Sequence, residues 1–164
     1  MRKEIYLAIT NRIKGKGLSI KHFDLWNENI FQAITMGKPF PTPAVFIEFE
    51  PFDWKQAGRR VKHADIYIKL HIVTVSRGET RIGCHTLESE LKYLDLVEDI
   101  TSALPGLSGS CFNALVHTGT VPNHNHENLV DNIERFKTHV TDRSATKYLN
   151  TAQTTALPVI KEKK

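Results

Sequence analysis

The chain has 164 residues, 40% of them hydrophobic, and a formal net charge of +4 with histidine counted as neutral. This length and composition suit one domain with one core, which we expect over residues 1–143, followed by a loose or extended arm over residues 144–164. No apolar run is long enough for a membrane-spanning helix, no apolar signal core follows the N-terminus, and the basic excess is too modest to indicate a dedicated nucleic-acid binder.

The N-terminal quarter contains one clear helix and one ambiguous segment. Apolar residues recur at helical spacing over residues 3–13, and Gly15 and Gly17 follow as stop signals, so we expect a short amphipathic helix there. Residues 19–43 fit either a short helix or an irregular packed segment, with residues 27–35 the better helix candidate.

Two strands with a long connection are predicted next. Residues 45–49 alternate between apolar and other side chains and end at Pro51, while residues 65–75 alternate over most of their length. We expect the two to pair as a hairpin, although the connection over residues 52–63 is longer than a tight turn needs. One side of the second strand is predicted to be an ordinary polar surface that faces solvent. It carries His63, Asp65, Lys69 and His71.

A long helix and two further strands complete the order. Residues 86–104 carry leucines, valine and isoleucine three or four residues apart and end at Pro105 and Gly106. The helix also carries a set of acidic residues, interpreted as its wet face: Glu88, Glu90, Asp95, Glu98 and Asp99. Strands follow over residues 112–122 and 129–140. The sequence therefore predicts an α+β fold, an antiparallel or mixed sheet of about four strands with the long helix and the short N-terminal helix packed on one face.

In this order of elements the chain resembles the tail-terminator and tail-completion proteins of long-tailed bacteriophages. The segments that carry the resemblance are residues 43–49 leading into the long hairpin loop, residues 64–75, residues 87–104 with their Pro-Gly ending, residues 116–122 and residues 136–142. Residues 18–42 and the segment after Ser144 have no clear counterpart in that family.

The resemblance implies a structural virion protein at the head–tail junction, with no enzymatic activity, no cofactor and no metal. Such a protein assembles in the host cytoplasm into a ring, commonly a hexamer, and contacts copies of itself, the tail tube protein and a neck or connector protein. DNA would meet it only in passage through the channel, and no membrane partner is expected.

The long hairpin loop is the predicted contact with a neighbouring subunit or partner, because interface cores are enriched in aromatic residues and arginine. The candidate contact residues are Trp54, Arg59, Arg60 and Lys62. The alternative is that Trp54 folds back onto the sheet and the basic residues form a solvated hairpin tip.

The sequence leaves two further functions open. A different neck or connector ring protein would have the same size and location, and a nucleic-acid-binding accessory protein would place Arg59, Arg60 and Lys62 on phosphates. Cys84 and Cys111 show no metal-binding spacing and are interpreted as structural thiols.

A small metal-dependent enzyme is the remaining alternative. His124 and His126 would point both imidazoles to one side if they lay on a strand, and a further ligand such as His117 or His139 would have to converge on them. Asn123 and Asn125, which flank His124, favour a polar turn instead.

Overall fold

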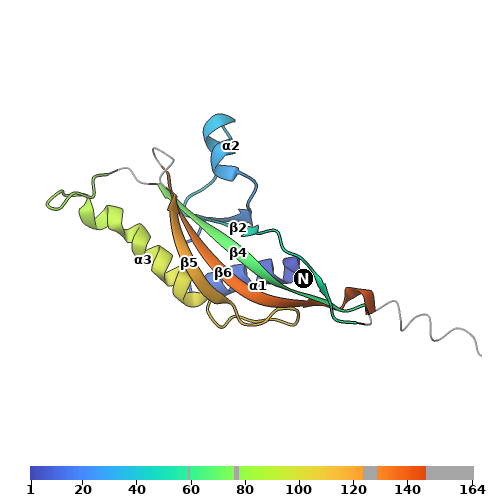
Figure 1. The fold of residues 1–164 in the computed structure, drawn as a ribbon. Coiled ribbons are helices and arrows are strands. Elements are labelled where there is room, and N and C mark those ends of the chain that lie inside the picture. The colour runs from blue at the N-terminus through green and yellow to red at the C-terminus, as the bar shows by residue number, and fades with distance from the viewer. Residues whose placement is uncertain (59, 76–77, 124–128, 147–164) are drawn as a thin grey trace, which may run out of the picture.

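The computed structural model describes residues 1–58, 60–75, 78–123 and 129–146, which form one sheet with helices on both of its faces (Figure 1). The helices are α1 (Arg2–Gly15), α2 (Asn29–Thr35) and α3 (Leu87–Ala103), with a single 3-10 turn, η1 (Ser144–Thr146). The strands are β1 (His22–Leu25), β2 (Ala44–Phe49), β3 (Lys55–Gln56), β4 (Lys62–Val75), β5 (Val116–Asn123) and β6 (Leu129–Asp142). Within these described ranges, no helix combines the length and apolarity needed to cross a membrane.

The sheet is mixed, in the order β1-β2-β4-β6-β5, with β3 added to the end of β4. The first pair, β1 with β2, is parallel, and the other pairs are antiparallel. The predicted α+β class and the predicted hairpin of β2 with β4 are confirmed. The sheet has two strands more than expected because β1 and β3, with four and two residues, are too short to produce a periodic signal.

The main core lies between the sheet and the two helices α1 and α3. Alternation along β4 turns Ile66, Ile68, Leu70 and Ile72 toward the helices, and Phe136 of β6 lies opposite Ile68 in the register. The helices contribute the residues predicted from their spacing, including Ile5, Ile9, Ile13, Ile100 and Leu104. Both helices therefore pack on one face of the sheet, as the sequence predicted.

The third helix, α2, covers part of the opposite face. Ile30 is its buried anchor and packs with Ala44, Phe46 and Val73 in a second, smaller core. The ambiguous segment thus forms both an edge strand, β1, and a helix, α2, close to the predicted residues 27–35. This helix covers the face of the sheet on which the sequence predicts no helix.

The predicted solvent exposure of His71 is wrong. The residue is 4% exposed, because Trp26 lies over its ring with ring centres 3.7 Å apart and planes within 5° of parallel. The Nδ1 and Nε2 atoms lie 3.2 Å and 3.1 Å from carboxylate oxygens of Asp131 and Glu48. The alternation of side chains along β4 predicts the correct face of the sheet for His71. The burial of His71 depends instead on the path of residues 22–35 over that face, which the alternation does not contain.

Candidate interaction surfaces

The β3–β4 hairpin carries the residues predicted to contact a partner. Its tip closes with the Ala57 amide donating to the Val61 carbonyl at 2.8 Å, and Arg60 is exposed there with a positive φ of 65°. Trp54 instead turns back toward the molecule, with its ring 5.2 Å from that of Phe52 and partly buried against the main core. Arg59 lies outside the described residues.

The cation of Lys62 is engaged within the chain. Its Nζ lies 4.7 Å from the centre of the Trp54 ring and 3.5 Å from an oxygen of Asp142. The ion pair holds the hairpin to the end of β6, and the ring contact holds Lys62 to the connection that precedes β3, so both stabilise the position of the hairpin. Arg60 is thus the candidate residue whose described position is open to a partner or to a phosphate.

The two candidate metal ligands within the described residues, His117 and His139, lie on opposite faces of the sheet. His124 and His126 lie outside the described residues. The Nε2 of His117 lies 2.7 Å from Glu134 on the face that α3 covers, while Nδ1 of His139 lies 2.9 Å from Asp65 on the opposite face. These two histidines therefore cannot both join one site, and the described ranges contain no cluster of three acidic, histidine or cysteine side chains suited to a metal.

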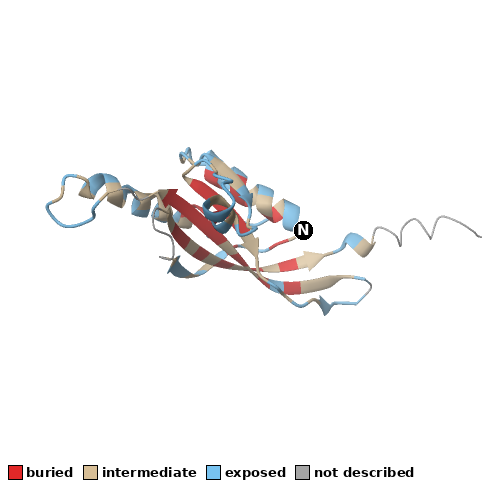
Figure 2. Cartoon of the chain, turned by 90° about the horizontal axis from the view of Figure 1, so that it is seen from above, coloured by how far each residue is buried: buried red, intermediate tan, exposed pale blue. Residues whose placement is uncertain are grey.

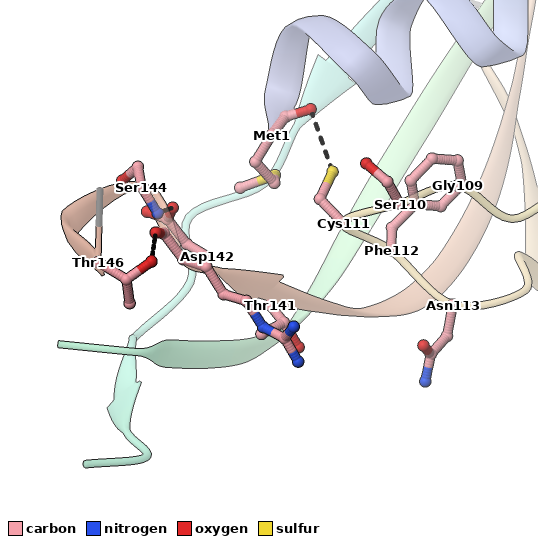
Figure 3. A pocket seen from close by; sticks show the side chains of 11 residues that line it. Met1, Gly109, Ser110, Cys111, Phe112, Asn113, Thr141, Asp142, Ser144 and Thr146 are labelled. Carbon is pink, nitrogen blue, oxygen red and sulfur yellow. Dashed lines mark hydrogen bonds between the residues drawn. The ribbon is translucent and has the colours of Figure 1, made fainter. Parts of the chain in front are cut away.

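A hollow of about 580 Å³ lies beside the N-terminus, between residues 109–113 and residues 141–146 (Figure 3). Next to it the Glu4 carboxylate accepts bonds from the Ser110 amide at 2.7 Å and the Ser110 hydroxyl at 2.9 Å. Hydrogen bonds from the Cys111 side chain and from Ser110 hold the pKa of Glu4 below its ordinary value. This link between distant segments leaves no periodic signal in the sequence.

Cys111 has the properties of a structural thiol. Figure 3 shows its sulfur pointing toward the Met1 carbonyl, at 3.9 Å. Burial, followed by the hydrogen bond and charge of Glu4, raises the pKa of Cys111 to about 11. Such a thiol is protonated at neutral pH and is a poor nucleophile, which argues against covalent chemistry in this hollow.

The face of the sheet that α2 leaves open is a ladder of alternating charges. Arg135 donates to Glu50 at 2.7 Å, and its guanidinium lies 4.2 Å from the centre of the Tyr67 ring. Lys69 lies 3.4 Å from Glu48, and a further pair is Lys137 with Asp65 at 3.2 Å. Because positive and negative groups are interspersed, the described residues of this face form no patch of a single sign that would attract nucleic acid.

Exposed apolar side chains recur along the segment that runs from the edge strand β1 to the end of α2. We call this set the α2 patch: Leu25, Phe31, Ile34 and Met36. Each of these side chains is between 50% and 59% exposed, although residues of this kind are usually buried. Apolar side chains gathered on one short segment are typical of a protein–protein contact.

A groove lies at the other edge of the sheet, between α3 and strands β5 and β6. This α3–β5 groove measures about 620 Å³, and its lining includes Leu94, Val97, Pro105, Asn132 and Glu134. Glu134 is 1% exposed and accepts from the hydroxyl of Thr120 at 2.7 Å. Asn132 is 8% exposed, and its Nδ2 has no hydrogen-bond partner among the described residues.

The predicted apolar stripe of α3 is longer than the core that it covers. Ile100 and Leu104 are fully buried, whereas Leu94, two turns earlier, is 43% exposed. Figure 2 shows the buried residues concentrated in the sheet and the nearby helix turns, with the distal part of α3 extending beyond them. The stripe therefore continues past the intramolecular core, along one wall of the α3–β5 groove.

Comparisons with known proteins give little further information. No protein-family model matches the chain, and no curated protein matches it. Among solved structures, it is similar to a chain of a particle described as "Virion of native gene transfer agent (GTA) particle", with 11% sequence identity and a TM-score of 0.46. The match covers 84% of this chain and 94% of that chain.

Proposed function

We propose that the chain is a structural virion protein of a tailed bacteriophage, a ring-forming tail-terminator or tail-completion subunit at the head–tail junction. It binds copies of itself in a closed ring and contacts the tail tube protein on one side and a neck or connector protein on the other. The proposal joins the family resemblance of the sequence to the surfaces described above.

The observation that carries the proposal is the pair of unlike surfaces at opposite edges of one sheet. The α2 patch lies at the β1 edge and the α3–β5 groove at the β5 edge. A ring of identical subunits needs a heterologous interface, in which each copy presents two different surfaces to its two neighbours. Two separate surfaces rich in apolar side chains meet this requirement.

The β3–β4 hairpin supplies a third surface, for a partner outside the ring. It extends beyond the helices together with the end of β6 (Figure 2), and its tip presents Arg60 to solvent. The Lys62 cation contacts both the Trp54 ring and Asp142, which gives the hairpin a defined position. A positioned loop with an exposed arginine is suited to a protein contact.

The test is the oligomeric state of the full chain, measured by light scattering and negative-stain electron microscopy over a range of concentration and salt. We expect a closed ring, or a monomer that forms a ring when purified tail tube protein of the same phage is added. A chain that stays monomeric under all these conditions and ignores the tube protein would contradict the proposal.

A charge reversal tests the hairpin separately. We expect Arg60→Glu to weaken binding of tube or connector protein while the ring persists, because Arg60 belongs to neither the α2 patch nor the α3–β5 groove. Lys3→Glu, a reversal at an exposed position of α1, is the matched control and should leave partner binding unchanged. Equal losses in both variants would point to a general charge effect instead of a hairpin contact.

A further inference from the structure

We propose that the α2 patch of one copy docks into the α3–β5 groove of the next copy and that this contact builds the ring. The inference rests on the proposed function and deepens it, because it identifies the two surfaces that meet. The occupant of the groove is thus a second copy of this chain.

The side chains that line the groove determine which kind of segment can bind in it. One wall is apolar, through Leu94, Val97 and Pro105, and Glu98 lies at its exposed rim. The buried amide of Asn132 is a hydrogen-bond donor without a partner among the described residues, a state that costs free energy unless a ligand supplies an acceptor. The groove therefore suits an apolar segment that brings both a carbonyl and a positive charge.

The α2 patch, the end of helix α2 and the residues just after it together have these three properties. Phe31, Ile34 and Met36 provide apolar side chains that match the wall of the groove. The last carbonyls of a helix lack intrahelical donors, so the C-terminal end of α2 offers acceptors to the Asn132 amide. Lys38 is exposed two residues after Met36 and provides the charge complementary to Glu98.

The places of the two surfaces allow the contact to repeat. They lie at opposite edges of the sheet, and α2 covers the face opposite to the one on which α3 packs. Each copy can therefore use its patch on one neighbour and its groove on the other without overlap. A head-to-tail contact of this kind closes into a ring when the rotation between copies fits.

Charge exchange gives the sharpest test. Lys38→Glu and Glu98→Lys should each weaken ring assembly, and the double variant should restore it, with the monomer–ring equilibrium followed by sedimentation velocity. Both side chains are exposed, so the fold should tolerate each reversal, as circular dichroism would verify. If the double variant is as weak as the two single variants combined, the two residues do not meet and the inference is overturned.

An apolar disruption adds a larger effect. The variant Phe31→Asp with Ile34→Asp should raise the protein concentration needed for assembly on the order of tenfold or more, since buried aromatic anchors dominate interface energies. Leu7→Asp is the matched control, because Leu7 is an exposed leucine of α1 outside both surfaces and should leave the ring intact.

Cross-linking identifies the contact directly. In a Cys84→Ser, Cys111→Ser background, Ile34→Cys and Leu94→Cys in one chain should give a ladder of disulfide-linked multimers on oxidation, while Ile34→Cys alone should give none. A dimer from Ile34→Cys alone would show two α2 patches meeting each other and would overturn the inference. A wild-type ring that survives every variant would refute only this interface, whereas a wild-type chain that never assembles would refute the proposed function as well.

Discussion

At the scale of single residues, the arrangement that matters most for the stability of the fold is His71, which lies between two carboxylates. His71 faces Asp131 and Glu48 through its two ring nitrogens and is covered by Trp26. Each ring nitrogen of His71 thus lies within hydrogen-bonding distance of a different carboxylate. Asp131 is fully buried, so the array contributes stability only as long as its partners remain together.

Replacement of the histidine should therefore be costly. His71→Ala removes the ring that faces the buried Asp131 carboxylate and leaves the Asn123 amide, which donates to Asp131 at 3.3 Å. We expect a loss of about 3 kcal/mol in the free energy of unfolding, measured with urea. His139→Ala is the control, because the contact of His139 with Asp65 is exposed and should matter little. Similar losses of unfolding free energy in the two variants would mean that burial of the His71 array adds nothing to the stability of the fold.

The Glu4 link predicts a dependence of stability on acid. Its pKa is lowered in the folded chain, first by the Cys111 side chain and then by Ser110, so its contribution is complete above the ordinary value of 4.5 and is lost as the pH falls through the lowered value. The effect should be small, because the hydrogen bonds are exposed. Thermal melts of wild type and Glu4→Gln should differ near neutral pH and converge in strong acid. A difference that grows toward low pH would contradict this sign.

At the scale of elements, α3 divides into a buried half and an overhanging half. Ile100→Ala should cost about 2–5 kcal/mol of unfolding free energy, because it opens a cavity against the sheet. Leu94→Ala on the same helix should stay within about 0.5 kcal/mol in the monomer, since Leu94 is 43% exposed and lies outside the main core, and should weaken assembly instead. Urea unfolding of the monomer, with light scattering for the ring, separates the two roles. Equal costs in the monomer would mean that the helix packs along its whole length.

At the scale of the whole molecule, the division into a domain and a C-terminal arm stays a prediction. The Ser144 amide donates to Asp142 at 2.8 Å, so a chain ending at Thr146 keeps the contact that closes β6. We expect this shortened chain to unfold within about 0.5 kcal/mol of the full chain, as measured with urea. A loss of several kcal/mol would place residues 147–164 in the folded domain, whereas unchanged stability with weaker assembly would assign the arm to a contact in the particle.

The sequence by itself determined the elements whose side chains repeat regularly. The spacing of apolar residues was sufficient for α1, α3, β2, β4 and most of β6, and it assigned the faces of β4 correctly. Such patterns are local, because each depends only on how one helix or strand presents its own side chains to a core.

Tertiary structure alone decided what depends on segments far apart in the chain. Trp26 buries His71 from a distant loop, and α3 with two strands forms a groove around Asn132 and Glu134. The placement of the α2 patch and this groove at opposite edges follows from strand order, which no local pattern contains. The candidate assembly surfaces were therefore missed by sequence reasoning, which had identified only the hairpin, because exposure is a property of the folded chain and not of a residue type.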